Sequence, residues 1–447
     1  MTISILVCVA SFAALVALLR RDRVSLGLPI AYLFGLLLIH VPGAVAHAIG
    51  GDVLRDSDQT ALGIYFAAVG TVAFVVGVWA SRVRTVRAPR ASAPRERFWM
   101  FCLIGGWVFT YGFSSFGRIP SIGAAIEEGG AIWMLGVLLG LRAALERKQA
   151  ASLLFWLGAL AVYPVLMLLL GGFLSYGSAA IIVVISSLAI STRSHWRTAV
   201  GIAAVAYLGF NVFLNYFQHR DEIRAAVWGG ASLTERVDVS LNALREFEWF
   251  RPSNDVQLQS LDARLNQNRF VGLAASRIAD GQVDYLYGRS LWEGVISLVP
   301  RIVWPDKPVV AGSPKIVSEM TGLTLSDTTS FGVGNVMEFQ INFGIPGVVV
   351  GFFVLGVVLG WLDRKAAIAE RAGDFGVLLL FFLPAVAAIR PNGSMVEIVG
   401  GPAAAIVAAH VWKRLWHHWS ARQSMAARSV RPLVQSRKAT RVGARAV

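Results

Sequence analysis

The stretch FGIPGVVVGFFVLGVVLGWL, residues 343–362, has twenty residues and no charged side chain. A helix of this length rises about 30 Å, which matches the hydrocarbon core of a lipid bilayer. The stretch therefore predicts a transmembrane helix, and it sets the class of protein to which the rest of the chain should belong.

The composition extends this prediction to the whole chain. Of its 447 residues, 55% are hydrophobic and 15% are charged, and the mean hydropathy is +0.60. No soluble core needs so much apolar sequence, so we expect an all-α, polytopic integral membrane protein. The net charge of +14 lies mainly in connectors between apolar segments. This favours membrane topology over nucleic-acid binding, and no nucleic-acid partner is expected.

Ten further apolar segments reach or approach the length of a span. We expect about 11 transmembrane helices, at residues 3–19, 26–47, 61–80, 98–116, 131–145, 153–170, 176–190, 199–217, 343–362, 375–389 and 395–412. Alternate connectors are rich in Lys and Arg. The positive-inside rule therefore places the N-terminus outside and the C-terminal tail in the cytoplasm.

The predicted spans divide the chain into four parts. They are an N-terminal bundle of eight spans (1–217), a large extracytoplasmic loop with re-entrant or interfacial helices (218–342), a C-terminal bundle of three spans (343–412) and a basic cytoplasmic tail (413–447). A loop of about 125 residues is much longer than a simple connector. We therefore expect it to bind a ligand.

The end of the loop is polar and irregular. PRIVWPDKP, residues 300–308, contains three prolines and a fourth follows at 314, which excludes a long regular helix. A Ser/Thr-rich run at 324–330 comes next, and then Glu338 and Asn342-Phe343-Gly344 at the start of a span. This arrangement resembles the signature of oligosaccharide repeat-unit polymerases, the Wzy-type O-antigen or exopolysaccharide polymerases.

The resemblance implies a GT-C type membrane glycosyltransferase in the cell inner membrane. Its active site would lie at the extracytoplasmic face, and its substrate would be a polyprenyl-diphosphate-linked oligosaccharide. The growing glycan would pass from its lipid carrier to the terminal sugar of an incoming lipid-linked repeat unit. The expected partners are this substrate, membrane lipid, a flippase and a chain-length regulator, and no cofactor is expected.

Cleavage of such a substrate leaves a diphosphate anion, which Arg or Lys donors can stabilise. We predict Arg301 and Arg390 as catalytic cations, with Lys307 at the same membrane surface. The alternative is that these side chains snorkel or pair within loops, as Lys307 would with Asp306.

The acceptor hydroxyl needs a base, and we predict Glu338, which precedes the ninth span by a few residues. A carboxylate partly withdrawn from water there is suited to accept a proton. The alternative role is structural, as the partner of a nearby cation. Asp327 and His219 are the other candidate bases.

Substrate-binding residues are predicted from the polar and aromatic side chains of the loop. They are Lys307, Arg264, Arg269, Trp304, Asn342 and Thr329. RLNQNR, residues 264–269, either holds sugar hydroxyls or diphosphate or forms a solvated helical face. Trp304 either stacks on a sugar ring or anchors the loop at the membrane interface.

No metal is predicted at the site. An alternative, metal-dependent mechanism rests on Asp56 and Asp58, because paired acids in an outer loop can hold a divalent cation that bridges diphosphate oxygens.

Two other functions stay open: a glycan ligase of the same architecture, and a transporter or flippase for lipid-linked sugars. A transporter is expected to carry ionisable residues at mid-membrane and a repeated architecture. The clearly polar mid-span residues are His40, Asn211 and Asn215, and no repeat is visible. The enzyme is therefore the preferred interpretation.

Overall fold

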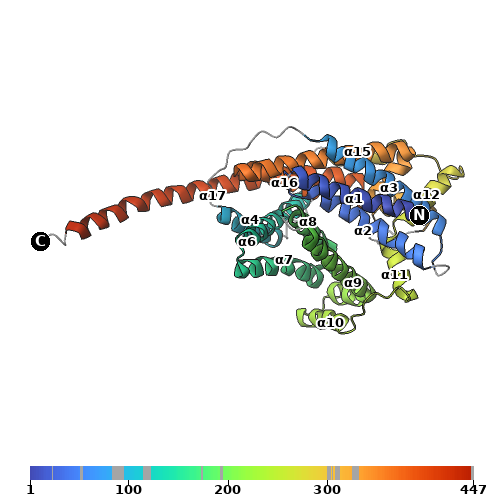
Figure 1. Cartoon of the computed structure of the whole chain (residues 1–447), viewed down its shortest axis with the longest axis horizontal. Helices are drawn as coiled ribbons and strands as arrows, with labels where there is room; N and C mark the ends of the chain where they lie inside the picture. The colour runs from blue at the N-terminus through green and yellow to red at the C-terminus, as the bar shows by residue number, and fades with distance from the viewer. Residues whose placement is uncertain are drawn as a thin grey trace.

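The computed structural model describes residues 1–22, 24–50, 54–82, 95–113, 122–172, 175–191, 195–299, 304, 306–307, 313–324 and 332–443. Every regular element in these ranges is an α-helix (Figure 1). The helices are α1 (Thr2–Asp22), α2 (Leu28–Ile49), α3 (Ser57–Ala80), α4 (Arg95–Gly112), α5 (Ile122–Gly130), α6 (Ile132–Arg147), α7 (Ala150–Gly171), α8 (Ser175–Ser191), α9 (His195–Trp228), α10 (Leu233–Arg245), α11 (Asp255–Leu265), α12 (Asn268–Ala279), α13 (Arg289–Ser297), α14 (Ser313–Thr321), α15 (Asn335–Ala372), α16 (Phe375–Ala387) and α17 (Met395–Gly443).

The prediction of an all-α membrane protein is confirmed. Within the described residues, eight helical segments are long and apolar enough to cross a membrane. Two shorter apolar helices, Ala179–Ile190 and Phe375–Ala387, coincide with predicted spans. The remaining predicted span falls on α4, whose first three residues are charged. Each of the eleven predicted spans therefore overlaps a helix within the described residues, and their number stays a prediction.

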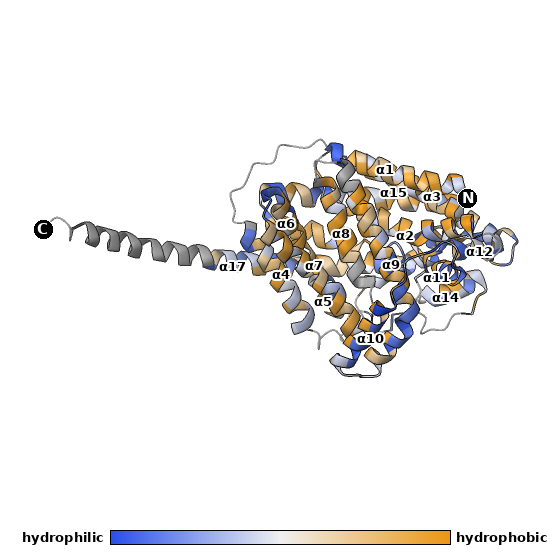
Figure 2. Ribbon diagram, turned by 60° about the horizontal axis from the view of Figure 1, so that its bottom comes forward, coloured by the Kyte–Doolittle hydropathy of each residue, from blue (hydrophilic) through white to orange (hydrophobic). Residues whose placement is uncertain are grey.

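Large apolar side chains point away from the protein along several of these helices. Leu154 on α7 is 70% exposed, and Val350 on α15 is 61% exposed. Figure 2 shows hydrophobic residues along α1, α3 and α15, whereas α10 carries both hydrophilic and hydrophobic residues. Contact with lipid tails explains such apolar exteriors on a helical bundle.

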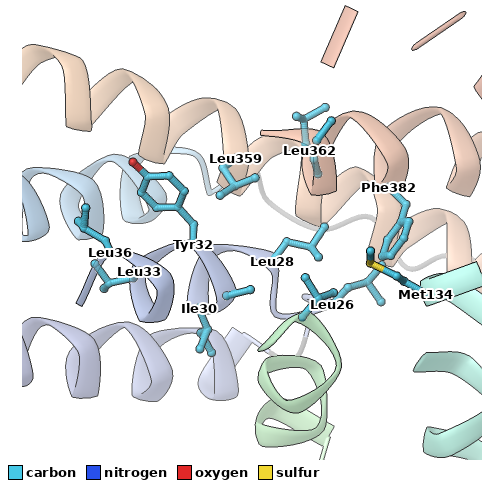
Figure 3. Packing of buried hydrophobic residues seen from close by; sticks show 14 of the residues in the cluster. Leu26, Leu28, Ile30, Tyr32, Leu33, Leu36, Met134, Leu359, Leu362 and Phe382 are labelled. Carbon is cyan, nitrogen blue, oxygen red and sulfur yellow. The ribbon is translucent and has the colours of Figure 1, made fainter. Parts of the chain in front are cut away.

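In the core, buried side chains of α2 and α15 lie close to residues of α6 and α16 (Figure 3). Tyr32 on α2 stacks on Phe74 on α3 with ring centroids 4.8 Å apart. Glycines bring α3 and α15 together, because a side chain at Gly77 would meet the backbone of Phe353 and one at Gly356 would meet that of Phe74. Small residues allow this close approach of membrane helices.

Helix α15 is two helices joined at a kink. Phe343 has φ −144° and ψ 16°, and Gly344 has φ 62° and ψ −145°, a conformation that glycine adopts without steric cost. The first part, residues 335–342, is buried on every side, whereas the second part has exposed apolar residues. The predicted ninth span thus begins at the kink.

The predicted extracytoplasmic loop is largely helical. It contains the end of α9 and helices α10 to α14. Helix α13 in this loop buries Ser290 and Gly294 and leaves Trp292 63% exposed. An amphipathic helix of nine residues is too short to span a membrane, as expected. Which side of the membrane the loop occupies stays a prediction.

Candidate functional site

Glu338 lies in the buried first part of α15 and is only 1% exposed. Its Oε2 accepts a hydrogen bond from the backbone N–H of Met395, the first residue of α17, at 2.7 Å. The hydroxyl of Ser290 on α13 also hydrogen-bonds to this carboxylate. Three helices therefore hold one acid in a defined orientation.

Asn342 lies one turn after Glu338 and is fully buried. Its Nδ2 donates to Ser290 Oγ at 2.8 Å and to the Glu338 carbonyl at 2.7 Å, and its Oδ1 accepts from Gly288 N at 2.9 Å. A hydrogen-bond chain thus runs from Asn342 through Ser290 to Glu338. These bonds position α13 against α15, and a role of Asn342 in substrate binding stays a prediction.

Arg390, in the turn between α16 and α17, contacts two glutamates at the end of α5. Its Nη2 donates to Glu128 Oε1 at 2.6 Å and lies 3.6 Å from Glu127 Oε1. The Glu128 side chain is 9% exposed and that of Arg390 is 30% exposed. The guanidinium is therefore held by buried acid rather than snorkelling at a helix end.

Glu397 is exposed in the first turn of α17, near both Glu338 and the Glu128–Arg390 pair. Its negative charge acts on the carboxyl groups of Glu338 and Glu128, which it repels. Glu293 on α13 also interacts with Glu338, and burial raises the pKa of the Glu293 carboxyl. We call Glu128, Glu293, Glu338 and Glu397 the carboxylate cluster. In the ranges that the structure describes, no three His, Cys, Asp or Glu side chains meet in a way that could hold a metal ion.

Other predicted site residues have different surroundings. Lys307 donates from Nζ to the carbonyls of Ser297 and Val299, both at 3.1 Å, and so binds the C-terminal end of α13. A cation there complements the helix dipole. Trp304 is 40% exposed. The predicted residues Arg301 and Thr329, and the candidate base Asp327, lie outside the described residues.

The RLNQNR segment does not form a solvated helical face at its centre. Asn266 and Asn268 are 2% and 0% exposed, because a glycine on α2, Gly43, and one on α3, Gly63, give them space between the helices. Arg269 pairs through Nε with Asp56 Oδ2 at 2.7 Å, so one of the two acids of the alternative metal site binds a cation.

A polar network that was not predicted surrounds this segment. His47 on α2 contacts Asp262 Oδ1 through Nε2 at 2.7 Å and Ser57 Oγ through Nδ1 at 3.0 Å. Asn266 Nδ2 donates to Asp262 Oδ1 at 2.6 Å and to Thr60 Oγ1 at 3.0 Å. The network fastens α11 to α2 and α3. His47 at the end of an apolar segment was the available signal, but its partner is 215 residues away in the chain.

The polar mid-span residues bind loop backbone and side chains. His40 Nδ1 contacts Asn268 Oδ1 at 2.7 Å. Asn211 Oδ1 accepts from Phe250 N at 2.6 Å, and Asn215 Oδ1 accepts from Glu248 N at 2.8 Å. These hydrogen bonds explain why polar side chains occur at mid-span positions. In a transporter, such positions would line the substrate path.

An apolar groove of about 890 Å³ lies between α4 and α17. Its walls include Phe101, Phe109, Trp412 and Trp419. Trp412 Nε1 donates to the carbonyl of Gly129, the residue after Glu128, at 3.0 Å. The groove wall is thus joined directly to the helix that holds Arg390.

The fold and the site define a class: an all-helical membrane protein with an acid-rich polar site where α13, α15 and α17 meet. The chain belongs to the family described as a domain of unknown function, DUF8712, which matches residues 53–382. No curated protein and no solved structure matches the chain.

Proposed function

We propose that the protein is a membrane glycosyltransferase that polymerises polyprenyl-diphosphate-linked oligosaccharide repeat units. The observation that carries this proposal is Glu338, a carboxylate buried at the start of a membrane helix and oriented by two donors from other helices. A buried, oriented carboxylate is a common form of general base.

In the proposed reaction, Glu338 takes the proton of the acceptor hydroxyl while the oxygen of that hydroxyl bonds to the anomeric carbon of the donor glycan. The bond from that carbon to the diphosphate oxygen breaks, and its electron pair leaves with the diphosphate. Attack opposite the leaving group inverts the anomeric configuration. The acceptor approaches along the accessible edge of the carboxylate cluster, which Glu397 forms.

Arg390 is proposed to lie beside the leaving diphosphate and to stabilise its charge. Glu128 holds its guanidinium in one orientation at 2.6 Å while 30% of the side chain stays exposed. A guanidinium that is already oriented can stabilise developing negative charge without reorganising. Arg301 is proposed to act with it, and Trp304 to contact a sugar ring.

The groove between α4 and α17 supports a lipid-linked substrate. Its aromatic and aliphatic walls suit an isoprenoid chain, and Trp412 connects it to the segment that carries Glu128. A chain lying in the groove would bring its head group toward Arg390. A ligase would use the same site with another acceptor.

The test uses the purified full chain in nanodiscs with a lipid-linked repeat unit, and polymer length is read by gel or mass spectrometry. The wild type should produce a ladder of products, and Glu338→Gln should bind the substrate without extending it. Glu319→Gln is the matched control, because Glu319 pairs with Arg289 outside the carboxylate cluster. Full extension by Glu338→Gln would remove Glu338 from the reaction, and transfer to a non-repeat acceptor would identify a ligase.

A further inference from the structure

The last turns of α9 carry a stripe of basic and aromatic residues. Phe217, Arg220, Arg224 and Trp228 are spaced three, four and four residues apart. Residues at these spacings share one face of an α-helix. The stripe lies at one end of the candidate span Val200–Trp228.

A third arginine reaches this stripe from α11, which packs against α9 (Figure 1). The guanidinium carbon of Arg264 lies 4.3 Å from the centroid of the Phe217 ring, and that of Arg220 lies 5.2 Å from the same centroid. Arg224 lies over Trp228 at 5.2 Å. Stacking on aromatic rings holds guanidinium groups in place and leaves their edges able to donate.

The three cations repel one another. Burial lowers the pKa of Arg264, and the nearby charges of Arg220 and Arg224 lower it further. Asp221 pairs with Arg220 Nε at 3.3 Å, but its side chain is 94% exposed. An exposed ion pair of this kind contributes little, so Asp221 offsets little of the charge of Arg220.

Gathering like charges costs free energy unless an anion binds among them. A phosphate presents several acceptor oxygens and suits the forked donors of arginine. The aromatic surroundings indicate the source of that phosphate. Trp228 is 63% exposed at the end of a membrane helix, which is typical of a side chain at the level of lipid head groups.

We propose that Arg220, Arg224 and Arg264 form a binding site for the phosphate or diphosphate head group of a lipid. The site is separate from the carboxylate cluster, because its arginines lie on α9 and α11 whereas the cluster lies on α5, α13, α15 and α17. This proposal does not depend on whether the protein is a glycosyltransferase. If the proposed function is correct, the site is a place where a lipid carrier waits near the bundle.

Binding is tested by native mass spectrometry of the full chain in a neutral detergent. The probes are farnesyl diphosphate, farnesol and phosphatidylglycerol. The wild type should retain farnesyl diphosphate but not farnesol. Arg264→Gln and Arg224→Gln should each weaken retention about tenfold or more, because each removes a charge-assisted donor. Arg264→Lys keeps the charge but loses the fork, and should recover only part of the affinity.

The control is Arg245→Gln on α10, an exposed arginine whose Nη1 donates to Asn242 at 3.1 Å. It changes the net charge equally and should leave retention unchanged. Equal retention by the wild type and Arg264→Gln, or equal loss in Arg245→Gln, would overturn the site. If phosphatidylglycerol is retained in competition with farnesyl diphosphate, the site binds bulk lipid. If only farnesyl diphosphate is retained, the site binds a lipid carrier. Neither result depends on polymerase activity.

Discussion

The backbone N–H of Met395 donates to Glu338 Oε2 at 2.7 Å, so the first residue of α17 orients an acid in the buried part of α15. This bond joins positions 57 residues apart. The orientation of the Glu338 carboxylate therefore depends on the packing of α17 against α15.

Glu338→Gln should fold normally, because its amide oxygen can still accept from Met395 and Ser290. Glu338→Leu should lower the unfolding temperature, because it leaves two buried donors without an acceptor, at about 1–3 kcal/mol each. Thermal unfolding in detergent measures this difference. Equal destabilisation by both variants would show that charge, rather than hydrogen bonding, fastens α15 to α17.

Arg390 and Glu128 form a partly buried pair, so single and double substitutions should differ. Arg390→Gln alone leaves the Glu128 carboxylate buried without this guanidinium and should cost about 3–5 kcal/mol of stability. Arg390→Gln with Glu128→Gln should recover most of that stability. If Arg390 also stabilises the leaving group, the double variant should still lose about a hundredfold in rate. Full activity in the stable double variant would leave Arg390 with a structural role alone.

Asn342 should be important for stability even without a role in substrate binding. Asn342→Leu removes three hydrogen bonds that connect α13, α15 and the turn before α13, so we expect a loss of about 3 kcal/mol. Chemical denaturation followed by tryptophan fluorescence measures it. An unchanged midpoint would contradict the assignment of Asn342 as the residue that positions α13.

The reaction is expected to proceed without a divalent metal. Asp56 binds Arg269, and its substitution should disturb α12 rather than catalysis. Transfer assays with EDTA, and with EDTA followed by excess magnesium, should give equal rates. Activity lost with EDTA and restored by magnesium would support the alternative mechanism based on Asp56 and Asp58.

The predicted topology can be tested by cysteine labelling. Both native cysteines, Cys8 and Cys102, are buried and should react slowly. In intact cells, an impermeant thiol reagent should label cysteines introduced at Gly281 and Asn392, and it should not label one at Lys148. All three positions are exposed in the structure. Labelling at Lys148 from outside would invert the predicted orientation.

The sequence alone was sufficient to predict an all-helical membrane protein. Apolar length and the placement of Lys and Arg are local properties, and burial in lipid requires the backbone to satisfy its own hydrogen bonds as helix. For the same reason it located the start of the ninth span at Asn342-Phe343-Gly344, where the structure has its kink. It also selected Glu338 and Arg390, because both stand at the ends of apolar segments.

Only the tertiary structure decided which of these residues meet. Arg390 binds Glu128, which is 262 positions earlier, and Asn266 is buried between α2 and α3 although its own segment is strongly polar. Such contacts depend on which helices pack together and on where glycines such as Gly43 and Gly63 leave space. Local hydropathy does not encode this information, because a polar side chain has the same local pattern whether water or a distant helix satisfies it.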